Sequence, residues 1–167
     1  MKVASHNLPS SSSSWSLPPV GRLKCNVDAT IMANGMGFGA VIRDHSGSFV
    51  AAYDGLLRSK LDPYMAETLA IKEALTCLKQ RHMSHIILET DCLNFCTNYN
   101  SESVDLSYVG LLLKHGKVLA RDIVDVVVCH VQRSANHMVH ALMRATVSSS
   151  VLGVWDIIPP DCISGLL

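Results

Sequence analysis

The chain has 167 residues, which is long enough for one domain of ordinary size and short for two. Hydrophobic residues make up 49% of it and charged residues 17%, a composition typical of a packed globular core rather than of a disordered chain. Because 14 lysines and arginines balance 14 aspartates and glutamates, the formal net charge is zero, so binding to nucleic acid would have to depend on a local basic patch.

The six cysteines form no C-x-x-C pair, and several fall within apolar strand or helix patterns. This spacing argues against a zinc ribbon or a secreted disulfide framework and predicts free thiols in a reducing compartment. The chain shows neither the basic-then-apolar pattern of a secretory signal nor an N-x-[ST] acceptor, so we expect an intracellular protein of the nucleus or cytoplasm. The longest apolar runs are only as long as strands, and we therefore expect no membrane partner.

Composition divides the chain into three parts. Residues 1–21 hold a run of five serines and three prolines, which predicts a flexible leader. Residues 22–148 carry the strand and helix patterns and predict a single folded domain. Residues 149–167 predict a C-terminal tail that packs on the domain or extends it.

Three strands are predicted first, over residues 23–30, 35–44 and 47–57. The first alternates polar and apolar residues, and the "DHSG" stretch after the second supplies the residues of a hairpin turn. A helix is predicted next, from Pro63 to about residue 81, with Asp62 as its N-cap. The later elements are a strand over 85–90, helices over 91–99 and 105–121, a strand over 123–131 and a helix from 137.

This order of elements predicts an α/β fold. Three strands joined by hairpins pair in an antiparallel manner, whereas strands joined through helices pair in parallel. The sequence therefore predicts a five-stranded mixed sheet, with its first three strands antiparallel and with helices on its faces.

Three acidic residues stand out by their positions. Asp28 lies on the first strand, Glu67 in the first turns of the first long helix, and Asp91 at the end of the fourth strand. Each taken alone could be a turn former or a helix cap. Together they would repel one another unless cations were present, and oxygen ligands of this kind suit hard divalent ions that serve phosphoryl chemistry.

Five ordered motifs make the chain recognisable: "KCNVDAT", "GMGFGAVIRDHSGSFVAA", "AETLAIKEAL", "IILETDCLN" and "CHVQRSANHMVHALMRA". With the flanks "WSLPPVG" and "VWDIIPPDCISGLL", the chain resembles the ribonuclease H-like superfamily over about residues 15–167. The resemblance is to the plant retroelement-type, reverse transcriptase-like domain in particular. It implies the ribonuclease H-like fold, an RNA–DNA hybrid as partner, and endonucleolytic cleavage of its RNA strand that leaves 5′-phosphate and 3′-hydroxyl ends.

The resemblance also implies a set of metal ligands. Asp28 would bridge two Mg²⁺ or Mn²⁺ ions, with Glu67 and Asp91 completing the site. The stretch Asp28-Ala29-Thr30 lacks the D-x-E of the 3′–5′ exonucleases of the superfamily, which argues against that branch.

The last helix departs from the family pattern. Its fourth carboxylate position, the D of A-D-x-L-A, is occupied by His140, which we therefore predict as a catalytic and metal-ligating residue. Three hypotheses follow: neutral His140 still ligates and shifts the preference towards Mn²⁺; loss of one charge leaves a hybrid-binding module with little catalysis; or the position has drifted in a retroelement remnant. His137, one turn earlier, leaves a zinc site open as a further alternative, and His130 is interpreted as structural.

A hybrid-binding protein meets two phosphate backbones and recognises RNA through its 2′-hydroxyls. Small polar groups beside the metals are the candidates for the hydroxyls: Asn26, Ala29, Thr30 and Asn94. Basic residues are the candidates for the phosphates, each with a solvated surface role as the alternative: Arg133, Arg144, Lys114, His115, Lys117 and Arg121. We expect a monomer.

Overall fold

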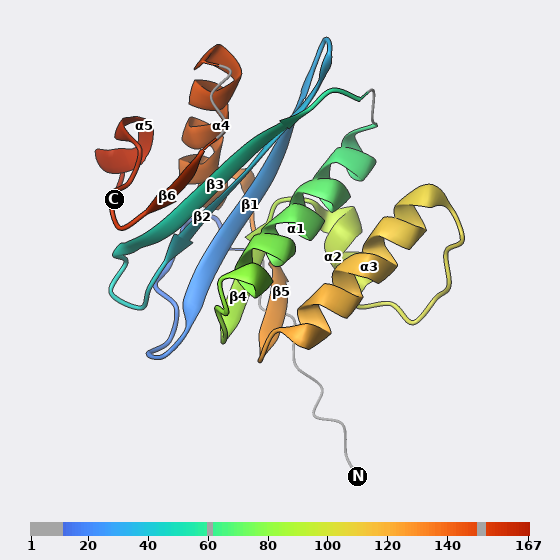
Figure 1. Cartoon of the computed structure of the whole chain (residues 1–167). Coiled ribbons are helices and arrows are strands. Elements are labelled where there is room, and N and C mark those ends of the chain that lie inside the picture. Colours follow the sequence, from blue (N-terminus) through green and yellow to red (C-terminus); the bar gives the residue numbers. More distant parts are fainter. Residues whose placement is uncertain (1–11, 60–61, 150–152) are drawn as a thin grey trace.

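The computed structural model describes residues 12–59, 62–149 and 153–167. A single mixed sheet lies between two layers of helices, with α1, α2 and α3 on one face and α4 and α5 on the other (Figure 1). The strand order is β5-β4-β1-β2-β3-β6. The strands are β1 (Leu23–Met32), β2 (Gly35–Arg43), β3 (Phe49–Leu57), β4 (Ile86–Thr90), β5 (Val126–His130) and β6 (Val154–Asp156). The helices are α1 (Pro63–Gln80), α2 (Leu93–Tyr99), α3 (Tyr108–Asp122), the 3₁₀ turn η1 (Arg133–Asn136), α4 (His137–Ser149) and α5 (Asp161–Ser164).

The predicted α/β fold and strand directions are confirmed. β1, β2 and β3 pair in an antiparallel manner, whereas β1, β4 and β5 pair in parallel through helical connections. The prediction of five strands is one short, because the C-terminal tail adds β6 antiparallel to β3. Helices α2 and α3 begin two to three residues later than the patterns predicted.

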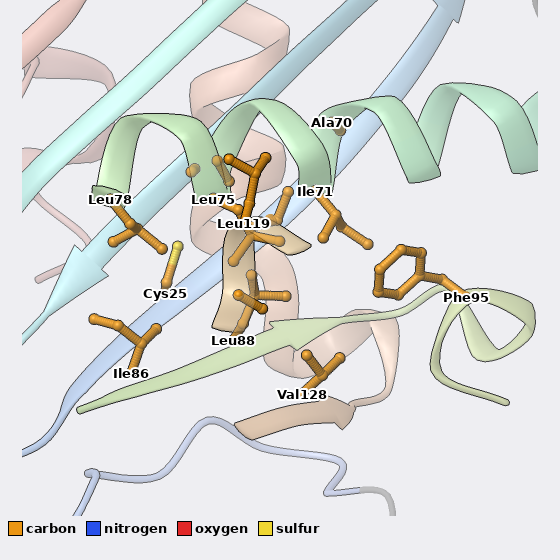
Figure 2. Packing of buried hydrophobic residues seen from close by; sticks show 14 of the residues in the cluster. Cys25, Ala70, Ile71, Leu75, Leu78, Ile86, Leu88, Phe95, Leu119 and Val128 are labelled. Carbon is orange, nitrogen blue, oxygen red and sulfur yellow. The ribbon is translucent and has the colours of Figure 1, made fainter. Parts of the chain in front are cut away.

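Helix α1 forms where its local signals predicted it. The Asp62 side chain accepts a hydrogen bond from the backbone N–H of Met65 at 3.0 Å, and Pro63 is the first helical residue. Ile71, Leu75 and Leu78 are fully buried along one side of the helix. Figure 2 shows these side chains packed against β1 and β4, with Phe95 of α2 and Leu119 of α3 closing the same core. This packing holds α1 across the middle of the sheet.

The opposite face has its own small core under α4. Met138, Val139 and Leu142 pack there against β2 and β3, joined by Ile163 of α5. Gly37 and Gly39 let this helix approach β2 closely, since a Cβ added to either would lie 2.7 to 2.8 Å from the Met143 side chain. The first turns of α4 are therefore held firmly over the middle of the sheet.

The two ends of the described chain also pack on the domain. Within the predicted leader, residues 12–17 contact η1, β1 and β2, while residues 1–11 lie outside the described residues. Gly21, with φ of +82°, turns the chain into β1. At the other end β6 and α5 cover β3 and α4. Among the described residues, no helix combines the length and the apolar run that a membrane crossing requires.

Candidate active site

The candidate site lies where two neighbouring parallel strands separate. The last paired residues of β1 and β4 are Asn26 and Glu89. Beyond them β1 continues alone beside β2, and β4 ends at Thr90. Asp28 and Asp91 each lie two residues past that last pair, so they face each other across the opening. Open edges of this kind, at the carboxyl ends of strands, are where α/β folds place reactive groups.

Helices from both faces of the sheet complete the cluster. Ligating atoms of Asp28, Asp91 and His140 all lie within 4.8 Å of one another. His140, in the first turns of α4, places Nδ1 2.5 Å from Oδ2 of Asp28. Glu67, on α1, interacts with the Asp28 carboxyl through a side-chain hydrogen bond. The structure therefore brings together all four residues that the sequence predicted as catalytic and metal-ligating.

Burial and mutual repulsion make these carboxyl groups unusual. Asp28 is 2% exposed, and burial with the nearby charge of Asp91 raises its pKa to about 7. Burial and the charges of Asp28 and Asp91 raise the pKa of Glu67 to about 9. The backbone N–H of Ala29 donates to both carboxyl groups and opposes these shifts. Without a cation the cluster therefore keeps protons that isolated carboxyl groups release well below neutral pH.

His140 contributes a neutral ligand at this position. Burial and the nearby positive charge of Arg133 lower the pKa of its imidazole, so the ring is uncharged at neutral pH. Its side chain is 17% exposed. Neutral imidazole is the form that binds a metal.

The donor set fits a divalent cation. Glu67 Oε2 and His140 Nε2 are buried and make no hydrogen bond, and the contact of Asp28 Oδ2 is the one with His140 Nδ1. Buried polar atoms are normally satisfied, and unsatisfied ones that converge at one place are typical of a site built for an ion. Two or three carboxylates with one imidazole suit Mn²⁺ better than Mg²⁺, because imidazole is a softer ligand than water or carboxylate. His137 is exposed and lies outside this cluster, with Nδ1 3.3 Å from the carbonyl of Ser134, so it adds no ligand.

The predicted nucleic-acid contacts differ in where the structure places them. Asn26 is 1% exposed, and its side-chain amide makes all its hydrogen bonds to other residues of the protein. The prediction that this side chain contacts a ligand is therefore wrong. The backbone N–H of Ala29 is occupied by the carboxyl groups beside it. Thr30 is partly exposed further along β1, and Asn94 is exposed in the first turn of α2, next to Asp91. Both remain available to a ligand at the opening.

The basic candidates form two groups. Arg133 is exposed at the start of η1, and its charge acts on both Asp28 and His140, which places it beside the cluster. Arg144 lies two turns along α4, where its charge also acts on His140. The others lie on α3, away from the cluster, and three of them line a pocket of about 570 Å³ against the loop before that helix: Lys114, Lys117 and Arg121. The Lys117 ammonium donates to the carbonyl of Ser101 at 2.8 Å.

Sequence reasoning missed a buried polar network behind the cluster. Lys24 of β1 and Glu89 of β4 form an ion pair at 2.8 Å, and both are almost fully buried. Asn136 of η1 donates to the carbonyl of Val27 at 2.9 Å and accepts from Asn26 at 3.1 Å. The available signal was Glu89, a charged residue inside the apolar "IILET" strand, which needs a buried partner.

The chain matches a known family over most of its length. The family model described as reverse transcriptase-like covers residues 26–146, which includes Asp28, Glu67, Asp91 and His140. A search among curated protein sequences finds no match.

Solved structures share the fold at low sequence identity. RNase H1 from the halophilic archaeon Halobacterium salinarum is 19% identical with a TM-score of 0.69, over 77% of this chain and 98% of that one. LC11-RNase H1, solved in complex with an RNA/DNA hybrid, is 16% identical with a TM-score of 0.67, over 77% and 99%. The N-terminal RNase H domain of a Mycobacterium tuberculosis protein is 17% identical with a TM-score of 0.64, over 78% and 99%.

Three observations point to the same family. They are the match to the family model, the order of the strands, and the cluster where β1 and β4 separate. The chain belongs to the reverse transcriptase-like family and has the fold of the RNase H structures.

Proposed function

We propose that the protein is a metal-dependent endonuclease that hydrolyses the RNA strand of RNA–DNA hybrids. The observation that carries the proposal is the convergence of Asp28, Asp91 and His140 within 4.8 Å, with Glu67 bonded to Asp28, at the open edge of the sheet. The similarity to LC11-RNase H1, which was solved with a hybrid, supports the choice of substrate.

Asp28, Asp91 and His140 would hold the divalent cation, with Glu67 adjacent. A cation there would supply Lewis-acid polarisation of the scissile phosphate and charge neutralisation at the leaving oxygen. The Ala29 N–H fixes the orientation of the Asp28 and Glu67 carboxyl groups, so little reorganisation is needed when charge develops.

Other side chains would position the substrate. Arg133, exposed beside the cluster, would pair with a phosphate oxygen next to the scissile bond. Asn94, exposed three residues after Asp91, and Thr30, partly exposed two residues after Asp28, would meet the 2′-hydroxyls that distinguish RNA from DNA. Water attacks phosphorus and the ribose 3′-oxygen leaves with a proton, which yields 5′-phosphate and 3′-hydroxyl ends.

His140 sets the choice of metal in this proposal. A neutral imidazole lowers the total ligand charge by one relative to a carboxylate, which reduces the affinity for Mg²⁺ more than for Mn²⁺. We therefore propose that Mn²⁺ supports hydrolysis better than Mg²⁺. Replacement of His140 by aspartate would restore a fourth acid and shift the preference back towards Mg²⁺.

The test is cleavage of a labelled RNA–DNA hybrid by the natural protein, Asp28→Asn and His140→Asp, each with Mg²⁺ and with Mn²⁺. Expected results are activity of the natural protein mainly with Mn²⁺, its loss in Asp28→Asn, and a gain with Mg²⁺ in His140→Asp.

The same panel separates the competing functions. Inactivity of the natural protein with both metals, combined with activity of His140→Asp, would mean a binding module that one residue disables. Inactivity of all three proteins, with folding confirmed by circular dichroism, would refute the proposed hydrolysis.

A further inference from the structure

The Asn26 side chain makes four hydrogen bonds behind the candidate site, and we call Asn26 with its four partners the junction: Trp15, Arg43, Glu89 and Asn136. Its Oδ1 accepts hydrogen bonds from the Trp15 indole at 3.1 Å and from the Arg43 guanidinium at 3.2 Å. Its Nδ2 donates to Glu89 Oε2 at 2.9 Å and to Asn136 Oδ1 at 3.1 Å. An amide has two acceptor positions and two donor positions, so every hydrogen-bonding position of this side chain is used.

The segments that lead to Asp28, Asp91 and His140 meet at this junction. Asn26 precedes Asp28 by two residues on β1. Glu89 lies on β4 and precedes Asp91, which follows the strand, by two residues. In a strand, residues two apart share a face, so Asp28 lies on the same face of β1 as Asn26, while Asp91 follows Glu89 directly after β4 ends.

The third connection leads to the helix on the other face. Asn136 is the last residue of η1, directly before α4, and precedes His140 by four residues, about one helical turn. Asn136 is 1% exposed and also donates to the Val27 carbonyl, one residue before Asp28. The junction therefore joins β1, β4 and the start of α4 at fixed distances.

Trp15 closes the junction from the outside. Its ring lies over the Arg43 guanidinium, whose carbon is 3.4 Å from the ring centroid, and 5.4 Å from the Lys24 ammonium. Lys24 and Arg43 are directly opposite each other on β1 and β2, and each is only 4% exposed. Two buried like charges in register destabilise a sheet unless other groups compensate them. Here the aromatic face of Trp15 and the Glu89 carboxylate do so.

The segment that carries Trp15 is anchored on both sides. The Lys24 ammonium donates to the Ser16 carbonyl at 2.7 Å. The Gln132 backbone N–H donates to the Ser12 carbonyl at 3.0 Å, and the Ser134 hydroxyl donates to the Ser13 carbonyl. Residues 12–17, which we call the strap, thus tie β1 to the turn that begins α4.

We infer that Asn26 is a positioning residue for the metal site and that Trp15, on the strap, fixes the orientation of the Asn26 amide. The inference rests on the proposed metal site. Loss of the Trp15 donor leaves one acceptor position of Asn26 unsatisfied and frees the amide to rotate. Rotation breaks the bonds to Glu89 and Asn136 together, so Asp91 and His140 shift relative to Asp28 while the two apolar cores stay intact.

The test compares the two tryptophans of the full chain. Trp15→Phe keeps a ring over Arg43 and removes only the Nε1 donor, whereas Trp15→Ala removes both. Trp155→Phe, on β6 at the far edge of the sheet, is the matched control. Mn²⁺ affinity is measured by titration calorimetry below the melting temperature of each protein. We expect a loss of about tenfold in Trp15→Phe, more in Trp15→Ala, and a change within about twofold in Trp155→Phe.

A second readout does not depend on metal. In metal-free protein, the NMR signals of the His140 ring and of the Asn26 side-chain NH₂ are expected to shift in Trp15→Phe and not in Trp155→Phe, with core methyl signals unchanged. Unchanged Mn²⁺ affinity in Trp15→Phe would overturn the inference.

If the natural protein binds no Mn²⁺, the proposed metal site fails, and the NMR comparison then decides the inference alone. Shifted His140 and Asn26 signals would support the junction, whereas unchanged signals would refute it.

Discussion

Replacement of Glu67 by glutamine should stabilise the metal-free protein at alkaline pH. The folded-state pKa of Glu67 is raised from 4.5 to about 9, so the folded state holds a proton that the unfolded chain releases near pH 4.5. The contribution of Glu67 to the free energy of unfolding is fully present below about pH 4.5 and is lost progressively as the pH rises towards about 9. Asp28, with its pKa raised to about 7, acts in the same direction. Glutamine stays neutral throughout and can keep the hydrogen bond to Asp28.

The size of the effect follows from linkage. One pKa unit corresponds to ~1.4 kcal/mol, so the protonation of Glu67 costs at most ~1.4 kcal/mol at pH 5.5 and ~5 kcal/mol at pH 8. Rearrangement within the cluster reduces that cost, and we expect a gain of about 2 kcal/mol for Glu67→Gln at pH 8. For a chain of this size the gain corresponds to a rise of about 4–8 °C in melting temperature.

The assay is thermal and urea unfolding in EDTA at pH 5.5 and pH 8, followed by circular dichroism. Glu73→Gln is the matched control, because Glu73 lies on the same helix and makes a partly exposed ion pair with Lys72 at 2.7 Å. Saturating Mn²⁺ should reverse the order, since the cation stabilises the folded state that retains the carboxylate. A gain that is equal at both pH values, or a Glu67→Gln variant less stable than the natural protein at pH 8 in EDTA, would show that Glu67 is not held protonated in the folded state.

Three further predictions test other parts of the structure. Ile157 has φ of +70° and is 87% exposed, so Ile157→Gly should relieve left-handed backbone strain without loss of buried surface. We expect the free energy of unfolding, measured by urea titration, to rise by about 1 kcal/mol. A destabilised variant would contradict this. Gly39→Val places a side chain 2.7 Å from the Met143 sulfur and should destabilise the protein by about 1–3 kcal/mol, whereas a melting temperature equal to that of the natural protein would show that α4 does not rest on Gly39. Hybrid affinity should fall steeply with salt, and Arg133→Ala should reduce the slope of log K against log salt by about one, measured by fluorescence anisotropy with Asp28→Asn as the non-cleaving background; an unchanged slope would remove Arg133 from the phosphate contacts.

Features with local signals were predictable from sequence. Asp62 and Pro63 mark the start of α1 because capping and a fixed proline φ act within one turn. Alternating polarity predicted β1, and strand–helix order predicted parallel pairing with β4. The position of Asp28 on that strand then followed from the motif "NVD".

Features that depend on distant partners were not predictable. β6 has only three residues, Val154–Asp156, and exists because β3 offers them a free edge. Asn26 was predicted to contact nucleic acid because it lies near Asp28. Its internal role depends on Trp15, Glu89 and Asn136, which folding brings to Asn26 from positions up to 110 residues away in the sequence. Sequence spacing records which face a residue is on, but not which groups will occupy that face.

Strand selectivity distinguishes the proposed hydrolysis of the RNA strand from other nuclease activities. The natural protein, with Mn²⁺, is given three substrates of one sequence: an RNA–DNA hybrid labelled separately on each strand, single-stranded RNA and duplex DNA. We predict internal cleavage of the RNA strand of the hybrid only, with 5′-phosphate ends and with no cleavage by Asp28→Asn. Equal cleavage of single-stranded RNA, cleavage of the DNA strand, or cleavage that persists in Asp28→Asn would contradict the account.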